Sequence, residues 1–337
     1  MKKALLVIFV LFFSLFGYFY YSMNQYAASK ISLEKDEVYV TIPKGATLNR
    51  IIRILTEHGL IQEPIKFKFL ANILGYANKL QAGDFLLEKS YSNSEFLEFL
   101  SKAQNLQFKI VIPEGLNMYE IAELLDKNMI CDKLDFLSLC QNEKLLTELN
   151  IENSTVEGYL FPNTYLFHKK TDPELIIKRL NKELNDRFSQ ELLDQMARLN
   201  FTKNKTLTLA SIIEKETGQG SERSLISSVF HNRLEKNIRL QSDPTVIYGI
   251  WSNFDGNIKK SDLNNPTPFN TYTNNGLPPS PIANPGIESI MAALYPEKTD
   301  YLYFVSKNDG SHFFSVNLKD HINAVNRYQK KVVSDKL

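Results

Sequence analysis

Residues 209–217 read Leu-Ala-Ser-Ile-Ile-Glu-Lys-Glu-Thr and predict the last turns of a helix that carries two carboxylates, Glu214 and Glu216. Positions two apart lie about 200° apart around a helix axis, so only one of the two can face a given cleft. Ile212 and Ile213 fall on the turn before Glu216, and an apolar turn beside a carboxyl disfavours its charged form. This setting is typical of a general acid, although a surface helix with ordinary charges has a similar sequence.

Proline and glycine are concentrated downstream, in residues 265–286, and predict a stiff irregular loop. Such a loop favours a binding role, because a restrained backbone loses little entropy when it holds a ligand. Ser242-Asp243-Pro244 predicts a helix start, which makes helix capping the simplest interpretation of Asp243. Aromatic runs at 301–305 and 312–316 flank a glycine turn and predict a hairpin.

Two segments upstream resemble each other, Val40-Thr-Ile-Pro-Lys-Gly-Ala-Thr-Leu48 and Ile110-Val-Ile-Pro-Glu-Gly-Leu-Asn-Met118. Each predicts a strand, a Pro-Gly turn and the start of a helix, so the unit looks duplicated. The first copy predicts the order β-α-α-β over residues 38–105. Through Gly45, Thr47, Leu48 and Gly83 it resembles the LysM module, a small glycan-binding fold. The second opening covers residues 108–148.

The N-terminus reads Met-Lys-Lys, followed by an uncharged apolar segment at 4–23 that is long enough to cross a bilayer. Lys2 and Lys3 favour a cytoplasmic N-terminus, and tyrosines at the far end suit the membrane interface. We therefore expect a cytoplasmic tail at 1–3, a transmembrane anchor at 4–23, a polar stalk at 24–37 and an extracytoplasmic remainder. A removed signal peptide, cleaved near Ala27-Ala28-Ser29, is the alternative.

The composition excludes several classes of partner. With 39 Lys plus Arg against 38 Asp plus Glu, the net charge is +1, which disfavours nucleic acid. The five histidines and two cysteines form no metal-binding pattern, and we expect no metal and no cofactor. Cys131 and Cys140 would be able to pair in an oxidising compartment, but the sequence does not decide this.

Several long motifs, in order, closely resemble the endolytic murein transglycosylase family. They are Ala210-Ser-Ile-Ile-Glu-Lys-Glu-Thr217, Val229-Phe-His-Asn-Arg-Leu234, Leu240-Gln-Ser-Asp-Pro-Thr-Val-Ile-Tyr-Gly249, Asn270-Thr-Tyr272 and Gly276-Leu-Pro-Pro-Ser-Pro-Ile-Ala-Asn-Pro-Gly286. We therefore expect an α+β chain with an N-terminal transmembrane helix, a small LysM-like subdomain and a larger mixed α+β catalytic domain at 106–337.

The resemblance implies a single-pass inner-membrane enzyme with a periplasmic catalytic domain. Such an enzyme cuts nascent peptidoglycan glycan strands between N-acetylmuramic acid and N-acetylglucosamine, leaves 1,6-anhydro-muramic ends and terminates strand elongation. Peptidoglycan synthases are its implied partners. A membrane-tethered peptidoglycan-binding or scaffold protein without turnover is the rival interpretation.

By the same resemblance, Glu216 is the catalytic acid. The implied substrate-binding residues are Gln241, Asp243, Thr245, Tyr248, Asn270 and Tyr272. A hydrolase would need a second carboxylate, for which Asp243 and Glu222 are candidates. Arg223 and Arg233 are candidates for holding substrate carboxylates, although solvated helix charges are the commoner role of arginine.

Overall fold

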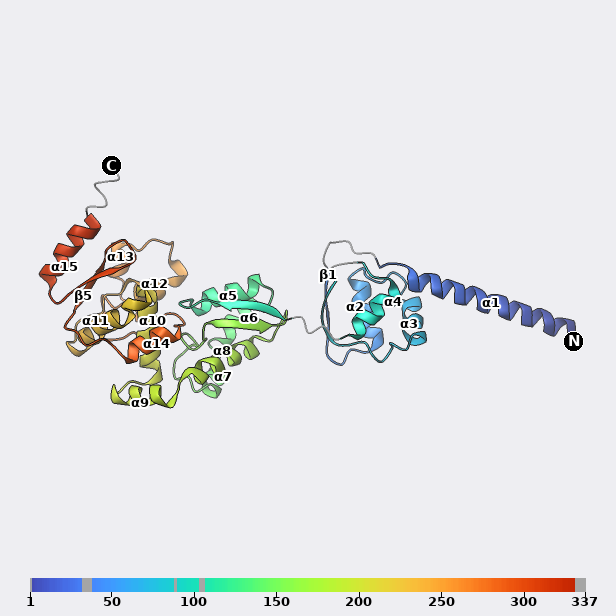
Figure 1. The fold of residues 1–337 in the computed structure, drawn as a ribbon, viewed down its shortest axis with the longest axis horizontal. Helices are drawn as coiled ribbons and strands as arrows, with labels where there is room; N and C mark the ends of the chain where they lie inside the picture. Colours follow the sequence, from blue (N-terminus) through green and yellow to red (C-terminus); the bar gives the residue numbers. More distant parts are fainter. Residues whose placement is uncertain (1, 32–37, 88–89, 103–106, 331–337) are drawn as a thin grey trace. The chain divides into compact units, whose positions relative to one another are not determined.

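The chain divides into two units, Met1–Phe108 and Lys109–Leu337, in a computed structural model that describes residues 2–31, 38–87, 90–102 and 107–330 (Figure 1). The first unit contains, in order, α1 (Lys2–Ala28), β1 (Val38–Ile42), α2 (Leu48–Glu57), α3 (Pro64–Ile73), β2 (Gly83–Leu87) and α4 (Asn93–Ser101).

The β-α-α-β order predicted for the first copy is present in this unit. Strands β1 and β2 pair antiparallel, with Val40 opposite Phe85, and helices α2 and α3 lie between them in sequence. Val40, Phe67, Phe85 and Phe96 are fully buried in one core. The LysM likeness itself remains a prediction.

Helix α1 is apolar enough to cross a membrane over Leu6–Ala28, with a mean hydropathy of 1.9. Its last turns belong to the core of the first unit, where Met23 and Tyr26 are buried. The amide of Asn93 also donates to the Tyr26 carbonyl at 3.0 Å. The helix therefore extends through the first residues of the predicted stalk 24–37, whereas residues 32–37 lie outside the described part of the chain.

The second unit is mixed α+β and begins at the second residue of β3. It contains β3 (Phe108–Ile112), α5 (Met118–Lys127), α6 (Lys133–Leu139), α7 (Glu143–Glu148), β4 (Asn163–Phe167), α8 (Pro173–Arg187), α9 (Gln190–Arg198), α10 (Lys203–Glu216), α11 (Arg223–Glu235), α12 (Asp243–Gly249), α13 (Lys260–Leu263), α14 (Ile287–Leu294), β5 (Tyr303–Ser306), β6 (His312–Ser315) and α15 (Leu318–Val325). The predicted hairpin is confirmed, since β5 and β6 pair antiparallel with Phe304 opposite Phe314.

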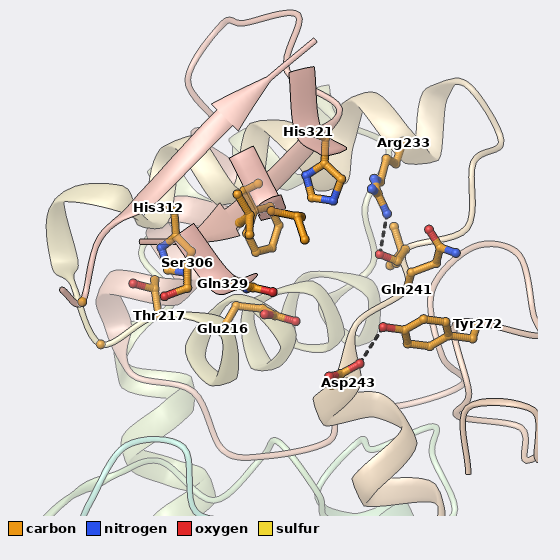
Figure 2. Close-up of a pocket in the computed structure, with 16 residues that line it drawn as sticks. Glu216, Thr217, Arg233, Gln241, Asp243, Tyr272, Ser306, His312, His321 and Gln329 are labelled. Atoms are coloured by element: carbon orange, nitrogen blue, oxygen red, sulfur yellow. Dashed lines mark hydrogen bonds between the residues drawn. The ribbon is translucent and has the colours of Figure 1, made fainter. Parts of the chain in front are cut away.

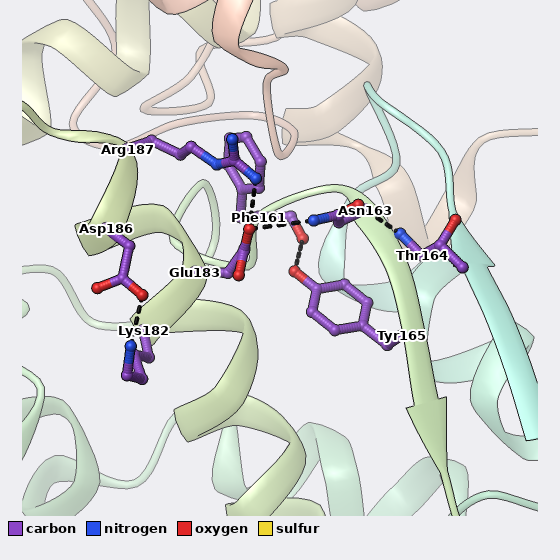
Figure 3. A network of polar contacts seen from close by, with 8 residues as sticks. All are labelled: Phe161, Asn163, Thr164, Tyr165, Lys182, Glu183, Asp186 and Arg187. Carbon is purple, nitrogen blue, oxygen red and sulfur yellow. Dashed lines mark hydrogen bonds and ion pairs between the residues drawn. The ribbon is translucent and has the colours of Figure 1, made fainter. Parts of the chain in front are cut away.

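The second copy of the duplicated unit also closes a small sheet, in which β3 pairs with β4. Strand β4 is tied to α8 by polar contacts (Figure 3): the Asn163 amide donates to Glu183 at 3.1 Å, and Arg187 pairs with the same carboxyl at 2.5 Å. Cys131 and Cys140 are both buried and both free.

Helix α10 is the centre of the second unit and packs against α14, α11 and α12. Leu207, Leu209, Ile212 and Ile213 are fully buried, because this helix is enclosed by other elements on most of its sides. Thr217 adopts an extended backbone and ends the helix, so Glu216 is its last residue. The apolar helix thereby delivers a carboxyl to the edge of the core.

Candidate active site

A cleft of about 690 Å³ opens at the end of α10, and Glu216 lines it (Figure 2). One wall comes from the β5–β6 hairpin, from α15 and from the π-helix η3 (Asn326–Lys330) that follows it, which contribute His312, His321 and Gln329. The other comes from the segment that leads into α12, which contributes Gln241 and Asp243. The cleft thus joins segments that lie more than a hundred residues apart in the sequence.

The hydroxyl of Ser242 donates to Glu216 Oε1 at 2.5 Å. Ser242 occupies the N-cap position of α12, where serine normally bonds its own helix, but here its side chain makes no capping bond. Its backbone N–H donates to Thr271 Oγ1 at 3.0 Å, and this bond fixes the position of the Ser242 backbone. The N-cap serine of α12 therefore donates its hydrogen bond to a carboxyl at the end of α10.

Burial raises the pKa of Glu216 to about 7, and the negative charge of Asp243 contributes in the same direction. The Ser242 hydrogen bond and the positive charge of Arg233 lower it, because both stabilise the carboxylate. A carboxyl with this pKa is about half protonated at neutral pH, so it can both give and take a proton there.

Glu214 has a different environment, although it belongs to the same turn. Its carboxylate accepts the Gly286 N–H at 3.0 Å and pairs with Arg223 at 3.3 Å. Between the two glutamates, Lys215 donates to the Gly115 carbonyl at 3.1 Å. Glu214 and Lys215 therefore hold neighbouring loops, and Glu216 is the member of the triplet that lines the cleft.

Three of the six predicted substrate-binding residues line the cleft: Gln241, Asp243 and Tyr272. The Tyr272 hydroxyl donates to Asp243 Oδ1 at 2.6 Å, so two of them are coupled (Figure 2). Gln241 has a left-handed backbone with φ of 51°, which is uncommon for a residue other than glycine. Arg233 also lines the cleft, but it is buried rather than solvated and donates to the Leu302 and Leu240 carbonyls.

Thr245 and Asn270 are fully buried behind the cleft wall. The Thr245 hydroxyl donates to the Ser242 carbonyl at 2.6 Å. The Asn270 amide donates to the Asn265 carbonyl at 2.7 Å, and its oxygen accepts the Tyr272 N–H at 2.8 Å. Their contacts position Ser242 and Tyr272.

Tyr248, the sixth residue, lines a second pocket of about 430 Å³ at the other end of α12. Tyr119 and Trp251 also line this pocket, and their rings stack with centroids 6.1 Å apart. The Tyr248 hydroxyl donates to Glu157 Oε2 at 3.1 Å. Aromatic faces of this kind suit flat apolar partners such as sugar rings.

Glu157 is a buried carboxyl that the sequence analysis did not single out. Besides Tyr248, it accepts the Met118 N–H at 3.0 Å and the Asn284 amide at 2.9 Å. Burial raises its pKa to about 7, and the hydrogen bonds from Met118 and Tyr248 oppose the rise. The only sequence signal is its place beside an aromatic Gly- and Pro-containing segment, which does not identify its partners.

The pair of Glu222 and His312 was also missed by the sequence analysis. Glu222 accepts His312 Nδ1 at 2.6 Å and the His312 backbone N–H at 3.0 Å. The two residues lie ninety positions apart, so no local spacing reveals them. This contact holds the β6 wall of the cleft against the start of α11.

A family model described as the YceG-like family matches residues 40–327, which include every site residue described above except Gln329. The chain belongs to the YceG-like family. This match and the names of its relatives together confirm the resemblance to the endolytic murein transglycosylase family that the motifs indicated.

Relatives of this YceG-like chain carry an enzyme name. This chain is 35% identical over 323 residues to the endolytic murein transglycosylase of Bacillus subtilis strain 168, and the alignment covers 90% of this chain and 88% of that protein. It is 30% identical over 358 residues to the endolytic murein transglycosylase of Streptococcus pneumoniae strain D39, covering 95% of this chain and 64% of that protein. A crystal structure of a YceG-like protein from Listeria monocytogenes aligns with a TM-score of 0.60 at 33% identity, covering 86% of this chain and 99% of that one.

Proposed function

We propose that this chain is an endolytic murein transglycosylase that cuts peptidoglycan glycan strands between N-acetylmuramic acid and N-acetylglucosamine, with Glu216 as its acid and base. The observation that carries the proposal is the Glu216 carboxyl, which lies at the end of a buried helix, lines an open cleft, and has a pKa raised to about 7. The names of two relatives that are 35% and 30% identical to this chain over the aligned residues support the choice of substrate.

The reaction needs one carboxyl that changes its protonation state. Protonated Glu216 donates to the glycosidic oxygen while the bond from that oxygen to C1 of muramic acid breaks. The resulting carboxylate takes the proton of the muramic 6-hydroxyl, whose oxygen attacks C1 and closes a 1,6-anhydro ring. The first proton stays on the hydroxyl of the released N-acetylglucosamine, the 6-hydroxyl proton regenerates protonated Glu216, and no water is consumed.

The surroundings of the other acids support the lytic outcome over hydrolysis. A hydrolase needs a second carboxylate that is free to act as nucleophile or to activate water. One oxygen of Asp243 accepts the Tyr272 hydroxyl, whereas Glu222 is not among the cleft-lining residues and both of its oxygens are engaged by His312. We infer that these acids shape the cleft.

We assign the predicted substrate residues by their position. Gln241, Asp243 and Tyr272 contact the sugars on either side of the cleaved bond, because they line the cleft with Glu216. Tyr248 and the aromatic pocket at the far end of α12 hold the strand further along. Thr245 and Asn270 act through Ser242 and Tyr272.

We further propose that α1 stays attached as a single-pass anchor in the inner membrane, with a cytoplasmic N-terminus and a periplasmic catalytic unit. Cleavage near Ala27-Ala28-Ser29 would remove Met23 and Tyr26 from the core of the first unit, which argues against a signal peptide. Tethered there, the enzyme would meet nascent strands while synthases still extend them, and its cuts would terminate their elongation.

The test is mass spectrometry of products from uncrosslinked glycan strands incubated with the detergent-solubilised full chain, with Glu216→Gln, and with Glu235→Gln as a matched control at an exposed position. We expect internal fragments with 1,6-anhydro-muramic ends from the wild type and the control, and a loss of at least about a thousandfold with Glu216→Gln. Reducing ends would instead indicate a hydrolase. Strands left intact by folded wild-type protein would favour the binding or scaffold role.

A further inference from the structure

Helix α3 in the first unit exposes three large apolar side chains on one face. Ile65, Phe69 and Ile73 are 73%, 53% and 60% exposed. They are spaced four residues apart, so they form one stripe along the helix. The opposite face carries Phe67, Leu70 and Ala71, which are buried in the core. The stripe is therefore not needed for folding of the unit.

The stripe is continuous with the surface of the membrane helix. The rings of Phe19 and Phe69 meet edge to face with centroids 6.3 Å apart. Phe19 lies inside the apolar span Leu6–Ala28 and is itself 46% exposed. Figure 1 shows α3 beside the end of α1, with β1 on the other side of the unit.

The orientation of α3 against α1 is fixed by polar contacts at its start. The Tyr26 hydroxyl donates to the Glu63 carbonyl at 3.3 Å. Lys66 pairs with the Glu63 carboxylate at 2.5 Å and lies over the Tyr26 ring at 5.7 Å. These contacts hold the apolar stripe at the level of Phe19.

Basic residues border the stripe on both sides. At 100° per residue, Lys66 and Lys68 fall on opposite flanks of the line from Ile65 to Ile73. Lysines in this position keep their charge in the headgroup region while their stems lie along apolar surface. Asn72 falls on the same flank as Lys68, where its amide donates to the Lys68 carbonyl at 2.7 Å.

We propose that the apolar stripe of α3 lies in the interface of the membrane that α1 crosses, so that the first unit rests on the bilayer. The neighbouring tyrosines Tyr18, Tyr20 and Tyr21 are typical of the same depth, where the acyl chains meet the headgroups. A bilayer is the occupant that the structure favours, because the stripe continues a surface that already lies in lipid. This proposal requires that α1 stays in the membrane as an anchor, and it does not require that the chain cuts glycan strands.

The test uses tryptophan quenching in vesicles. The full chain carries Trp251→Phe, so that an introduced tryptophan is its only one, and is reconstituted into phosphatidylcholine vesicles with lipids brominated in the upper acyl chain. The reporters are Phe69→Trp on the stripe, Lys44→Trp in the turn after β1, and Phe12→Trp within the span, which verifies insertion. All three positions are exposed, so these changes spare the core.

We expect the reporter at position 69 to be quenched at least about twofold more than the reporter at position 44. Replacing Ile65 and Ile73 by Ser should reduce quenching at position 69 and leave position 12 unchanged. Equal quenching at positions 69 and 44, while position 12 is quenched, would overturn the proposal.

Discussion

Ser242 and Glu216 are joined by a hydrogen bond of 2.5 Å in which the N-cap serine of one helix serves the last residue of another. Because the hydroxyl donates to the carboxyl oxygen, it stabilises the charged form and opposes the effect of burial on the pKa of Glu216. The protonation state of the acid is thus set by burial and the charge of Asp243, which raise its pKa, and by the Ser242 hydroxyl and the charge of Arg233, which lower it.

Ser242→Ala should raise the pKa of Glu216 above its value of about 7, because the bond that lowers it is lost. The acid would then stay protonated to higher pH. In a plot of kcat against pH, the basic limb, where kcat falls as the pH rises, should therefore move to higher pH. The loss of one positioning bond should also lower the maximal kcat about tenfold. A pH series on glycan strands measures both effects, and a limb that moves to lower pH would contradict the assignment.

Asp243→Asn should shift the same limb in the opposite direction. Asparagine keeps an oxygen for the Tyr272 hydroxyl but removes the negative charge that raises the pKa of Glu216. The basic limb should therefore move to lower pH. Tyr272→Phe is the matched control, because it removes the hydroxyl and keeps the charge of Asp243; its limb should stay in place even if KM rises.

Glu157→Gln should flatten the dependence of stability on pH. Burial raises the pKa of Glu157 from 4.5 to about 7 in the folded state. Its stabilising contribution is therefore complete below pH 4.5 and is lost as the pH rises through 7, by a total on the order of 3 kcal/mol. Urea unfolding at about pH 5 and about pH 7.5 measures the loss, which should be smaller in Glu157→Gln than in the wild type. The exposed variant Glu235→Gln should keep the wild-type difference.

Reductant should leave the melting temperature unchanged, because Cys131 and Cys140 are free in the folded chain. Burial also raises the pKa of the Cys131 thiol to about 12, so little thiolate is available to react. A thiol reagent should label both residues only after unfolding, as mass spectrometry would show. A Tm that falls when reductant is added would indicate a disulfide between Cys131 and Cys140, which are free in this structure.

Local patterns predicted the elements of the fold well, because each rests on its own periodicity and turn residues. The strand, Pro-Gly turn and helix of both copies are present, as is the β5–β6 hairpin. The helix period also limited the two carboxylates of Glu-Lys-Glu to one acid per cleft. The resemblance then selected Glu216, and the structure places that residue in the cleft while Glu214 pairs with Arg223.

The remaining features of the site depend on contacts between distant residues. Thr245 and Tyr248 lie three positions apart, but one is buried under Ser242 and the other faces a separate pocket. Glu157 meets Asn284 across 127 positions, and Glu222 meets His312 across ninety. No local period encodes such pairs, because they form only when whole elements pack together.

The two Pro-Gly turns of the duplicated unit share a backbone conformation but differ in what packs against them. Gly45 and Gly115 share a φ of 77°, so the turns begin from the same backbone geometry. Among the described residues, nothing lies within 4 Å of a side chain added at Gly45. One added at Gly115 would lie 3.5 Å from Glu214 and 3.6 Å from Lys215. Insertions should therefore be tolerated in the first turn, whereas in the second they would be transmitted to the helix end that carries the acid.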